Sequence, residues 1–125
     1  MNNSKRYHKS HQNFLERLSE LIISSMASGQ VSIESLASKM YISRGQLTRR
    51  VKAITGLTTQ QYAMQIRLDK ASELLSGQEY SIYDIAFKCG FEDPTSFSRA
   101  FRRKYGIPPS VYRNNISYNI NEIDI

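Results

Sequence analysis

Apolar residues recur at steps of three and four over most of this chain, which is the spacing of one face of an α-helix. The first such series runs from Phe14 to Met26, and Gly29 follows it as an end signal. No pattern of strands joined by tight turns competes with these series. The spacing therefore predicts an all-α fold with about seven helices.

Capping residues divide the apolar series into separate helices. Ser32 and Ser81 each precede a short helix, and serine is a preferred residue at helix N-termini. Ser43 and Gln46 form a Ser-x-x-Gln capping box that starts a second helix in the first half of the chain. Asp93, which is followed by proline, starts the corresponding helix in the second half. Each half is thus predicted to hold a short helix, a turn and a second helix.

A longer helix is predicted between the two halves. Thr58 and Gln61 repeat the capping-box pattern, and the apolar series after them continues to about Ser76. Its roughly 18 residues would span about 27 Å at 1.5 Å per residue. The apolar residues occupy more than one stripe, which is typical of a helix with packing partners on two sides. We expect a linker helix that joins two helix-turn-helix subdomains.

The two halves repeat one sequence pattern. The stretches 32–62 and 81–112 align with a single one-residue insertion. Matching pairs are Ile33 and Ile82, Ala37 and Ala86, Lys39 and Lys88, Leu47 and Phe97, Arg49 and Arg99, Lys52 and Arg102, Gly56 and Gly106, and Tyr62 and Tyr112. Two copies in register indicate a repeated unit much more strongly than one copy would. We expect a flexible basic arm over 1–12, a first unit over 13–57, a linker helix over 58–76, a second unit over 77–113 and a loose tail over 114–125.

Positive charge gathers where the repeats place their second helices. The chain has a formal net charge of +6, which favours a polyanionic partner. From Arg44 to Arg67 there are five basic residues and no acidic one, and the same holds from Arg99 to Arg113. The single cysteine, Cys89, fits a packed thiol in a reducing compartment. No apolar run approaches the ~20 residues of a membrane span, so we expect a cytoplasmic protein without membrane contact.

Other chemistry is thinly represented. His8 and His11 lie close together without a third ligand candidate nearby, so we expect solvated side chains and no metal site. The carboxylates form no acid–base pair, and neither a glycine-rich phosphate loop nor a Ser–His pair is present. We expect neither enzymatic activity nor a cofactor.

The second unit carries the most specific motif, SIYDIAFKCGFEDPTSFSRAFRRKYGIPPSVYR. It resembles the signature of the DNA-binding region of the AraC/XylS family of bacterial transcription regulators. The matching elements are Ile85-Ala86, Gly90-Phe91, Phe97-Ser98-Arg99, Phe101, Tyr105-Gly106, Pro109 and Tyr112-Arg113. The first unit, SIESLASKMYISRGQLTRRVKAITGLT, also matches, and its sequence is similar to those of the output domains of hybrid two-component sensor regulators. The resemblance covers residues 14–113.

The resemblance implies that the helices after Ser43 and Asp93 enter successive major grooves of double-stranded DNA. The base-facing positions that it implies are Gly45, Thr48 and Arg49 in the first unit and Pro94, Thr95, Ser98 and Arg99 in the second. Gly45 and Pro94 have no side-chain donor for a base edge. The predicted base contacts are therefore Thr48, Arg49, Thr95, Ser98 and Arg99. The predicted backbone contacts, some of which will pair with acids instead, are Arg44, Arg50, Lys52, Arg102, Arg103 and Lys104.

The expected DNA site spans roughly two helical turns. Adjacent major-groove faces repeat every ~34 Å, and the linker helix of about 27 Å approaches that spacing if the duplex bends. Because the repeats are tandem, we expect two unlike half-elements in the same orientation. The resemblance also implies RNA polymerase as a partner and a signal-receiving domain N-terminal to this chain.

Two rival functions stay open at this point. One is a stand-alone regulator that binds DNA as a monomer, which a long upstream extension of the reading frame would exclude. The other is a helical protein-interaction module that keeps its basic faces for an acidic protein. Binding to a random duplex that weakens steeply with added salt would argue against the module.

Overall fold

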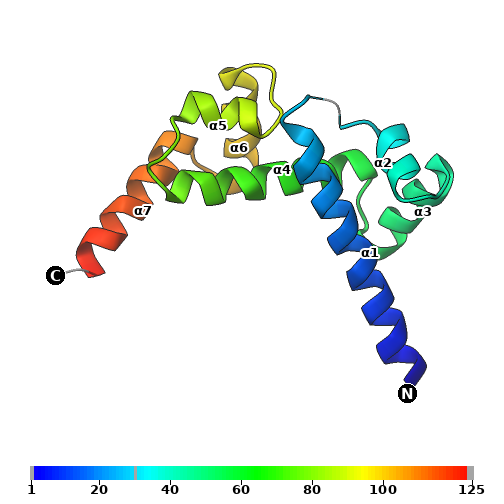
Figure 1. The fold of residues 1–125 in the computed structure, drawn as a ribbon. Helices are drawn as coiled ribbons and strands as arrows, with labels where there is room; N and C mark the ends of the chain where they lie inside the picture. The colour runs from blue at the N-terminus through cyan, green and yellow to red at the C-terminus, as the bar shows by residue number, and fades with distance from the viewer. Residues whose placement is uncertain (1, 30, 124–125) are drawn as a thin grey trace. The chain divides into compact units, whose positions relative to one another are not determined.

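The computed structural model describes residues 2–29 and 31–123, with side chains for residues 9–29 and 31–116. All regular structure in these ranges is helical, which confirms the all-α fold and the expected number of helices (Figure 1). The helices are α1 Asn2–Met26, α2 Ile33–Lys39, α3 Arg44–Thr55, α4 Thr59–Ser76, α5 Ile82–Lys88, α6 Pro94–Tyr105 and α7 Pro109–Ile123. In the part of the chain that is described, no helix has both the length and the apolar character that crossing a membrane requires.

The ends of α2 and α3 are set by the predicted capping residues. The backbone N–H of Ser35 donates to Ser32 Oγ at 3.1 Å. At α3, Gln46 N donates to Ser43 Oγ at 3.1 Å, and Ser43 N donates back to Gln46 Oε1 at 2.9 Å. These bonds satisfy N–H groups that the first turn leaves without a helical partner. Gly56 ends α3 in the left-handed conformation, with φ at 77°, which glycine adopts without the strain that a Cβ brings.

The second half of the chain has the same capping arrangement with different residues. Asp84 N donates to Ser81 Oγ at 3.0 Å at the start of α5. Asp93 caps α6 through two bonds from Ser96, one from its backbone N–H at 2.7 Å and one from its hydroxyl at 2.9 Å. Gly106 ends α6 with φ at 82°. The start and the end of both second helices are therefore determined by residues close by in the sequence.

The chain divides into two compact units, Met1–Ile66 and Arg67–Ile125, and the boundary falls within α4. In unit 1, α1, α2 and α3 pack around an apolar core together with the start of α4 (Figure 1). Its buried members are Phe14, Leu18, Ile22, Leu36, Ala37, Leu47, Val51 and Ala63. Tyr62 Oη lies 2.9 Å from Ser19 Oγ, so α4 is also joined to α1 by a hydrogen bond.

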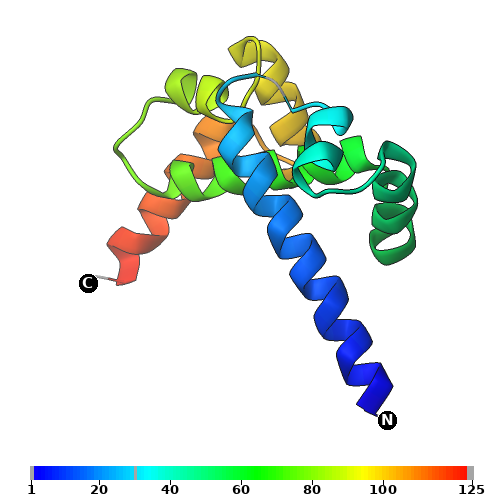
Figure 2. The ribbon, with the colours of Figure 1, turned by 45° about the vertical axis from the view of Figure 1, so that its right-hand side comes forward.

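Aromatic rings form the core of unit 2, where α5 and α6 pack together (Figure 2). Phe97 and Phe101 of α6 are fully buried, and their ring centroids lie 5.8 Å apart. Phe91 lies 5.3 Å from Phe97, and Tyr112 of α7 lies 5.2 Å from Phe101, centroid to centroid. The edge-on and tilted contacts are geometries that aromatic pairs prefer. These rings are therefore packing residues of unit 2.

Arg67 is a structural cation of unit 2. Its Nε donates to Cys89 O and its Nη2 donates to Gly90 O, both at 2.8 Å. Its guanidinium also lies 4.2 Å from the centroid of the Phe91 ring. Burial lowers the pKa of Arg67. This arginine belongs to a basic stretch of the sequence, yet its hydrogen bonds go to the end of α5.

The two ends of the chain differ from expectation. The arm over 1–12 was expected to be flexible and the tail over 114–125 loose, but α1 begins at Asn2 and α7 continues to Ile123. Neither segment contains glycine or proline, so nothing in them stops a helix that the packed part has already nucleated. The expected linker helix is α4. That α4 forms a separate part of the fold stays a prediction, because its residues up to Ile66 belong to unit 1 and those from Arg67 belong to unit 2.

Candidate nucleic-acid interface

The helix α3 buries one face and exposes the opposite one. Leu47 and Val51 are fully buried in the core of unit 1. Thr48, Arg49 and Lys52 are exposed. Because Leu47 and Val51 are held in the core, the opposite face of α3 is directed to solvent. The structure therefore brings the predicted base-reading residues Thr48 and Arg49 together on solvent-facing α3.

The helix α6 presents its predicted residues in the same manner. Phe97 and Phe101 anchor its buried face, while Thr95 and Arg99 are exposed. Ser98 is half-buried, so its hydroxyl is less accessible than the sequence suggested. Two exposed side chains and one half-buried one thus form the candidate reading surface of unit 2.

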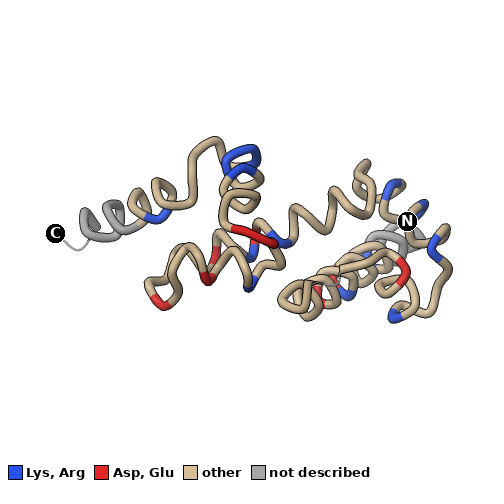
Figure 3. The backbone as a smooth tube through the Cα atoms, turned by 90° about the horizontal axis from the view of Figure 1, so that it is seen from above, with Lys and Arg blue, Asp and Glu red and all other residues tan. Residues whose placement is uncertain are grey.

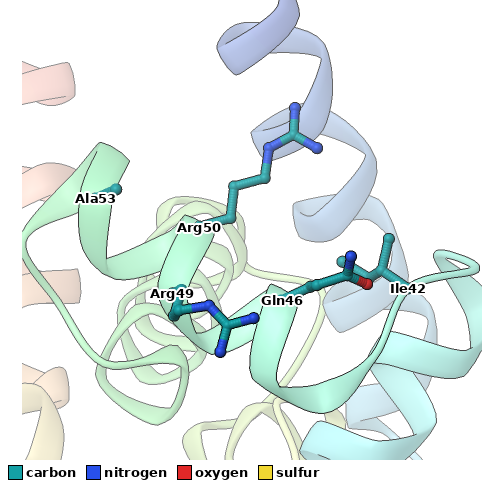
Figure 4. A pocket seen from close by; sticks show the side chains of 5 residues that line it. All are labelled: Ile42, Gln46, Arg49, Arg50 and Ala53. Carbon is teal, nitrogen blue, oxygen red and sulfur yellow. The ribbon is translucent and has the colours of Figure 1, made fainter.

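A shallow hollow of about 380 Å³ lies beside α3. It is lined by Ile42, Gln46, Arg49, Arg50 and Ala53 (Figure 4). The two arginines point apart in Figure 4, with Arg50 reaching toward α1 and Arg49 toward the start of α3. The surface predicted from the sequence did not include Ile42, Gln46 or Ala53. Helical spacing could have found Gln46 and Ala53, which lie three or four residues from the arginines, but not Ile42, which precedes α3.

Two predicted backbone-contacting cations of unit 1 bond within α2 and α3. Arg44 Nη1 lies 2.7 Å from Glu34 Oε1, and the two side chains are 62% and 70% exposed. An ion pair this exposed contributes little, so Arg44 can exchange its carboxylate for a phosphate at small cost. Lys52 Nζ donates to Gly56 O at 2.9 Å and so helps to cap the end of α3.

Arg50 covers an aromatic ring of α1. Its guanidinium carbon lies 4.2 Å from the centroid of Phe14, a residue that is 7% exposed. Its Nη2 also donates to Ser10 Oγ at 3.4 Å, a long hydrogen bond. A cation over a ring face is attracted by the electron density of the ring. The structure therefore gives Arg50 a packing role beside the predicted phosphate contact.

Three of the four basic residues of α6 lie in its last turn (Figure 3). Arg102 and Arg103 are exposed there. Lys104 Nζ is bonded to Asp69 Oδ1 at 2.5 Å, and Tyr105 Oη donates to the same oxygen at 2.8 Å. This network ties the end of α6 to α4 within unit 2. Of the three cations, Arg102 and Arg103 are the better placed to meet a polyanion.

Two groups in unit 2 have shifted pKa values with clear causes. Hydrogen bonds from the Ser96 backbone and hydroxyl hold the pKa of Asp93 below its usual value, and the charge of Arg99 acts in the same direction. Asp93 is therefore anionic at neutral pH. Burial raises the pKa of the Cys89 thiol to about 11. Cys89 is also fully buried, which confirms the expected packed thiol.

The described side chains contain no group of three or more histidine, cysteine, aspartate or glutamate residues that could hold a metal ion. His8, one of the two histidines considered from sequence, lies outside the described side chains. The surface chemistry of α3 and α6 is instead that of exposed guanidinium, ammonium and hydroxyl groups on convex helices. Such groups suit the edges of bases and the oxygens of phosphates.

The chain is similar to a helix-turn-helix family and to curated proteins that contain such a domain. The model of a helix-turn-helix domain family matches residues 36–115. The HTH-type transcriptional activator RhaS of Citrobacter koseri is 43% identical over 84 residues, which cover 67% of this chain and 30% of RhaS. Histidine kinase P4 of Formosa agariphila is 29% identical over 106 residues, 85% of this chain and 8% of that protein. The chain thus spans a small part of the length of either curated relative.

Solved structures of regulator domains have the same fold as this chain. The C-terminal domain of the two-component response regulator yesN from Fusobacterium nucleatum has a TM-score of 0.69 at 35% identity, covering 81% of this chain and 98% of that chain. The DNA-binding domain of AdpA, a global transcriptional factor solved in complex with a target DNA, has a TM-score of 0.73 at 30% identity. That alignment covers 84% of this chain and 94% of the AdpA chain.

Proposed function

Because the chain belongs to the AraC/XylS family of helix-turn-helix regulators, we propose that it binds specific sequences of double-stranded DNA and regulates transcription. In this proposal α3 and α6 are recognition helices that enter successive major grooves of one duplex. One observation carries it: both units expose an arginine, Arg49 and Arg99, at matching positions of equivalent capped helices. The likeness to a domain solved on its target DNA supports it.

Arg49 and Arg99 are the main base readers in this proposal. A guanidinium can donate two parallel hydrogen bonds to O6 and N7 of guanine, which contributes about 1–3 kcal/mol of discrimination. Thr48 and Thr95 are exposed on the same helices and can donate to a base or to the sugar-phosphate chain. Ser98 is half-buried, so we expect its hydroxyl to contribute less than those of Thr48 and Thr95.

The remaining cations supply affinity that does not depend on sequence. Arg102, Arg103 and Lys52 form the proposed first set of phosphate contacts, because each is exposed and bonds to no acidic side chain within the described residues. Arg44, Arg50 and Lys104 form a second set that must share or give up an intramolecular partner. We expect contacts from the second set to contribute less to binding.

We also propose that the chain is the output domain of a longer two-component regulator. The yesN domain and histidine kinase P4, both matched by this chain, support that placement. The signal would then arrive from a region N-terminal to α1, and activation would involve contact with RNA polymerase. Because the partner is chromosomal DNA, the proposed location of the domain is the cytoplasm.

A salt titration tests the proposed DNA binding. Fluorescence anisotropy of a labelled random duplex of about 25 bp would be followed between roughly 50 and 200 mM salt. The wild type is expected to lose affinity steeply, and the variant carrying R102A and R103A to have a slope shallower by about 2, at ~0.9 per phosphate contact. K70A is the matched control, since Lys70 pairs with Glu73 on α4 and lies on neither recognition helix.

The K70A control separates a local effect from the loss of net charge. It is expected to leave the salt slope within about 0.3 of the wild type, because it removes no proposed phosphate contact. Binding that does not respond to salt, or an equal loss in K70A and in the double variant, would favour the protein-interaction module over the DNA-binding domain.

A further inference from the structure

The first turn of α3 contains a glycine that the backbone does not require. Gly45 lies one residue before Gln46 of the capping box, inside the helix, and it is not among the residues with positive φ. Glycine in a helix lowers stability relative to alanine, since it has more backbone freedom to lose on folding. Neither the helix nor the cap therefore explains why this position lacks a side chain.

The side chain of Arg49 occupies the space that glycine leaves. Helical side chains lean toward the N-terminus, so residue 49 lies over residue 45. A Cβ on Gly45 would come within 3.1 Å of Arg49 Nη1 and within 3.7 Å of both Cζ and Nη2. Those guanidinium atoms are the three nearest side-chain neighbours that such a Cβ would meet. The guanidinium thus lies against the backbone at the start of α3.

The second unit provides an internal comparison. Sequence alignment places Thr95 at the position of Gly45 and Arg99 at the position of Arg49. Thr95 carries a branched side chain where unit 1 has none, so Arg99 cannot lie against the backbone in the same way. The two repeats therefore differ in the residue four positions before the matching arginine.

We propose that Gly45 is a specificity-determining residue of the first recognition helix, because it lets the Arg49 guanidinium lie along the first turn of α3 and so sets which base edge that group reaches. The inference rests on the proposed DNA binding and adds a residue that itself touches no base. Gly45 acts through Arg49 and is a positioning residue. A side chain at 45 would lift the guanidinium away from the helix and re-aim its donors.

The test uses G45T, which introduces the residue that unit 2 carries at this place, and G45A as a smaller change. Both are compared with R49A on labelled duplexes. One duplex carries the site that the wild type selects from a random duplex pool. Three others carry each of the other base pairs at the position where R49A loses preference. A bidentate arginine–guanine contact corresponds to roughly 5- to 150-fold discrimination. G45T is expected to reduce or redirect that preference by about tenfold, while affinity for random DNA stays within twofold because the charge is kept.

Folding and coupling are checked with the same proteins. G45A and G45T are expected to unfold at urea concentrations no lower than the wild type, since the atoms nearest to a Cβ at 45 belong to the far end of the flexible Arg49 side chain. In the R49A background, G45T is expected to change base preference by less than twofold, because two changes that act through one side chain are not additive. K70A, which lies on neither recognition helix, is the control and should leave the preference at the Arg49 position unchanged.

The outcomes are distinguishable. If R49A abolishes a base preference that G45T and G45A leave within twofold, the inference about Gly45 is overturned and the DNA-binding function stands. If G45T alters preference equally with and without Arg49, the effect does not pass through the guanidinium and the inference fails. Absence of binding to any duplex overturns both proposals.

Discussion

Replacing Arg50 with alanine tests whether the cation over Phe14 stabilises unit 1. The guanidinium lies 4.2 Å from the ring centroid, and the ring is 7% exposed beneath it. A cation–π contact at a largely exposed site contributes about 0.5–1 kcal/mol. The hydrogen bond to Ser10 is 3.4 Å long and adds little. We therefore expect R50A to lower the free energy of unfolding by about 1 kcal/mol.

Urea denaturation followed by far-UV circular dichroism measures this loss. With a slope of ~2 kcal/mol per molar urea, the expected shift of the midpoint is about 0.5 M. R102A is the matched control, because it removes the same side chain from an exposed position without an aromatic partner among the described residues. Its midpoint should stay within about 0.2 M of the wild type, as is usual for surface substitutions.

The charge-preserving variant R50K separates stacking from charge. A lysine ammonium is a compact point charge without a planar face, so it covers less of the Phe14 ring. R50K should therefore fall between R50A and the wild type. Equal midpoints for R50A, R102A and the wild type would refute the reasoning, since the contact with Phe14 would then carry no stability.

Three further predictions follow from the same contacts. S43A removes the acceptor of the capping box and should cost about 1 kcal/mol in urea denaturation; an unchanged midpoint would show that the box is not needed. The Cys89 thiol should react with a disulfide reagent at pH 8 at least tenfold more slowly in the folded than in the unfolded protein, because burial raises its pKa from 9.0 to about 11. The contribution of this thiol to the free energy of unfolding is therefore complete below pH 9 and is lost as pH rises toward 11. K104A should flatten the salt slope of DNA binding less than R103A does, since Lys104 is bonded to Asp69; an equal change in anisotropy titrations would contradict this.

Local sequence was sufficient to predict most helix ends and the buried faces. Ser43 with Gln46 and Asp93 with the proline after it start α3 and α6 where expected, because a cap depends on residues within one turn. The buried face of α1 followed from the helical spacing of the series from Phe14 to Met26, and both of these residues are buried. The two chain ends were less predictable, since polar composition does not by itself stop a helix that is already formed.

The contacts of long cationic side chains could not be predicted from spacing. Arg50 and Phe14 are distant in sequence and meet only because α1 packs on the helices after it. Lys104 finds Asp69 for a similar reason in unit 2. A basic stretch therefore indicates a polyanion-binding surface, but packing decides which of its members are available to it.

The central claim is that Arg49 and Arg99 read two separate elements of one DNA site. Selection of bound sequences from a random duplex pool, carried out with the wild type, R49A and R99A, tests it most directly. The wild type should select two unlike elements in the same orientation about 10 bp apart, centre to centre. Each variant should lose preference at one element and keep the other. Selection of an unchanged site by both variants, or a uniform loss at every position, would contradict the account.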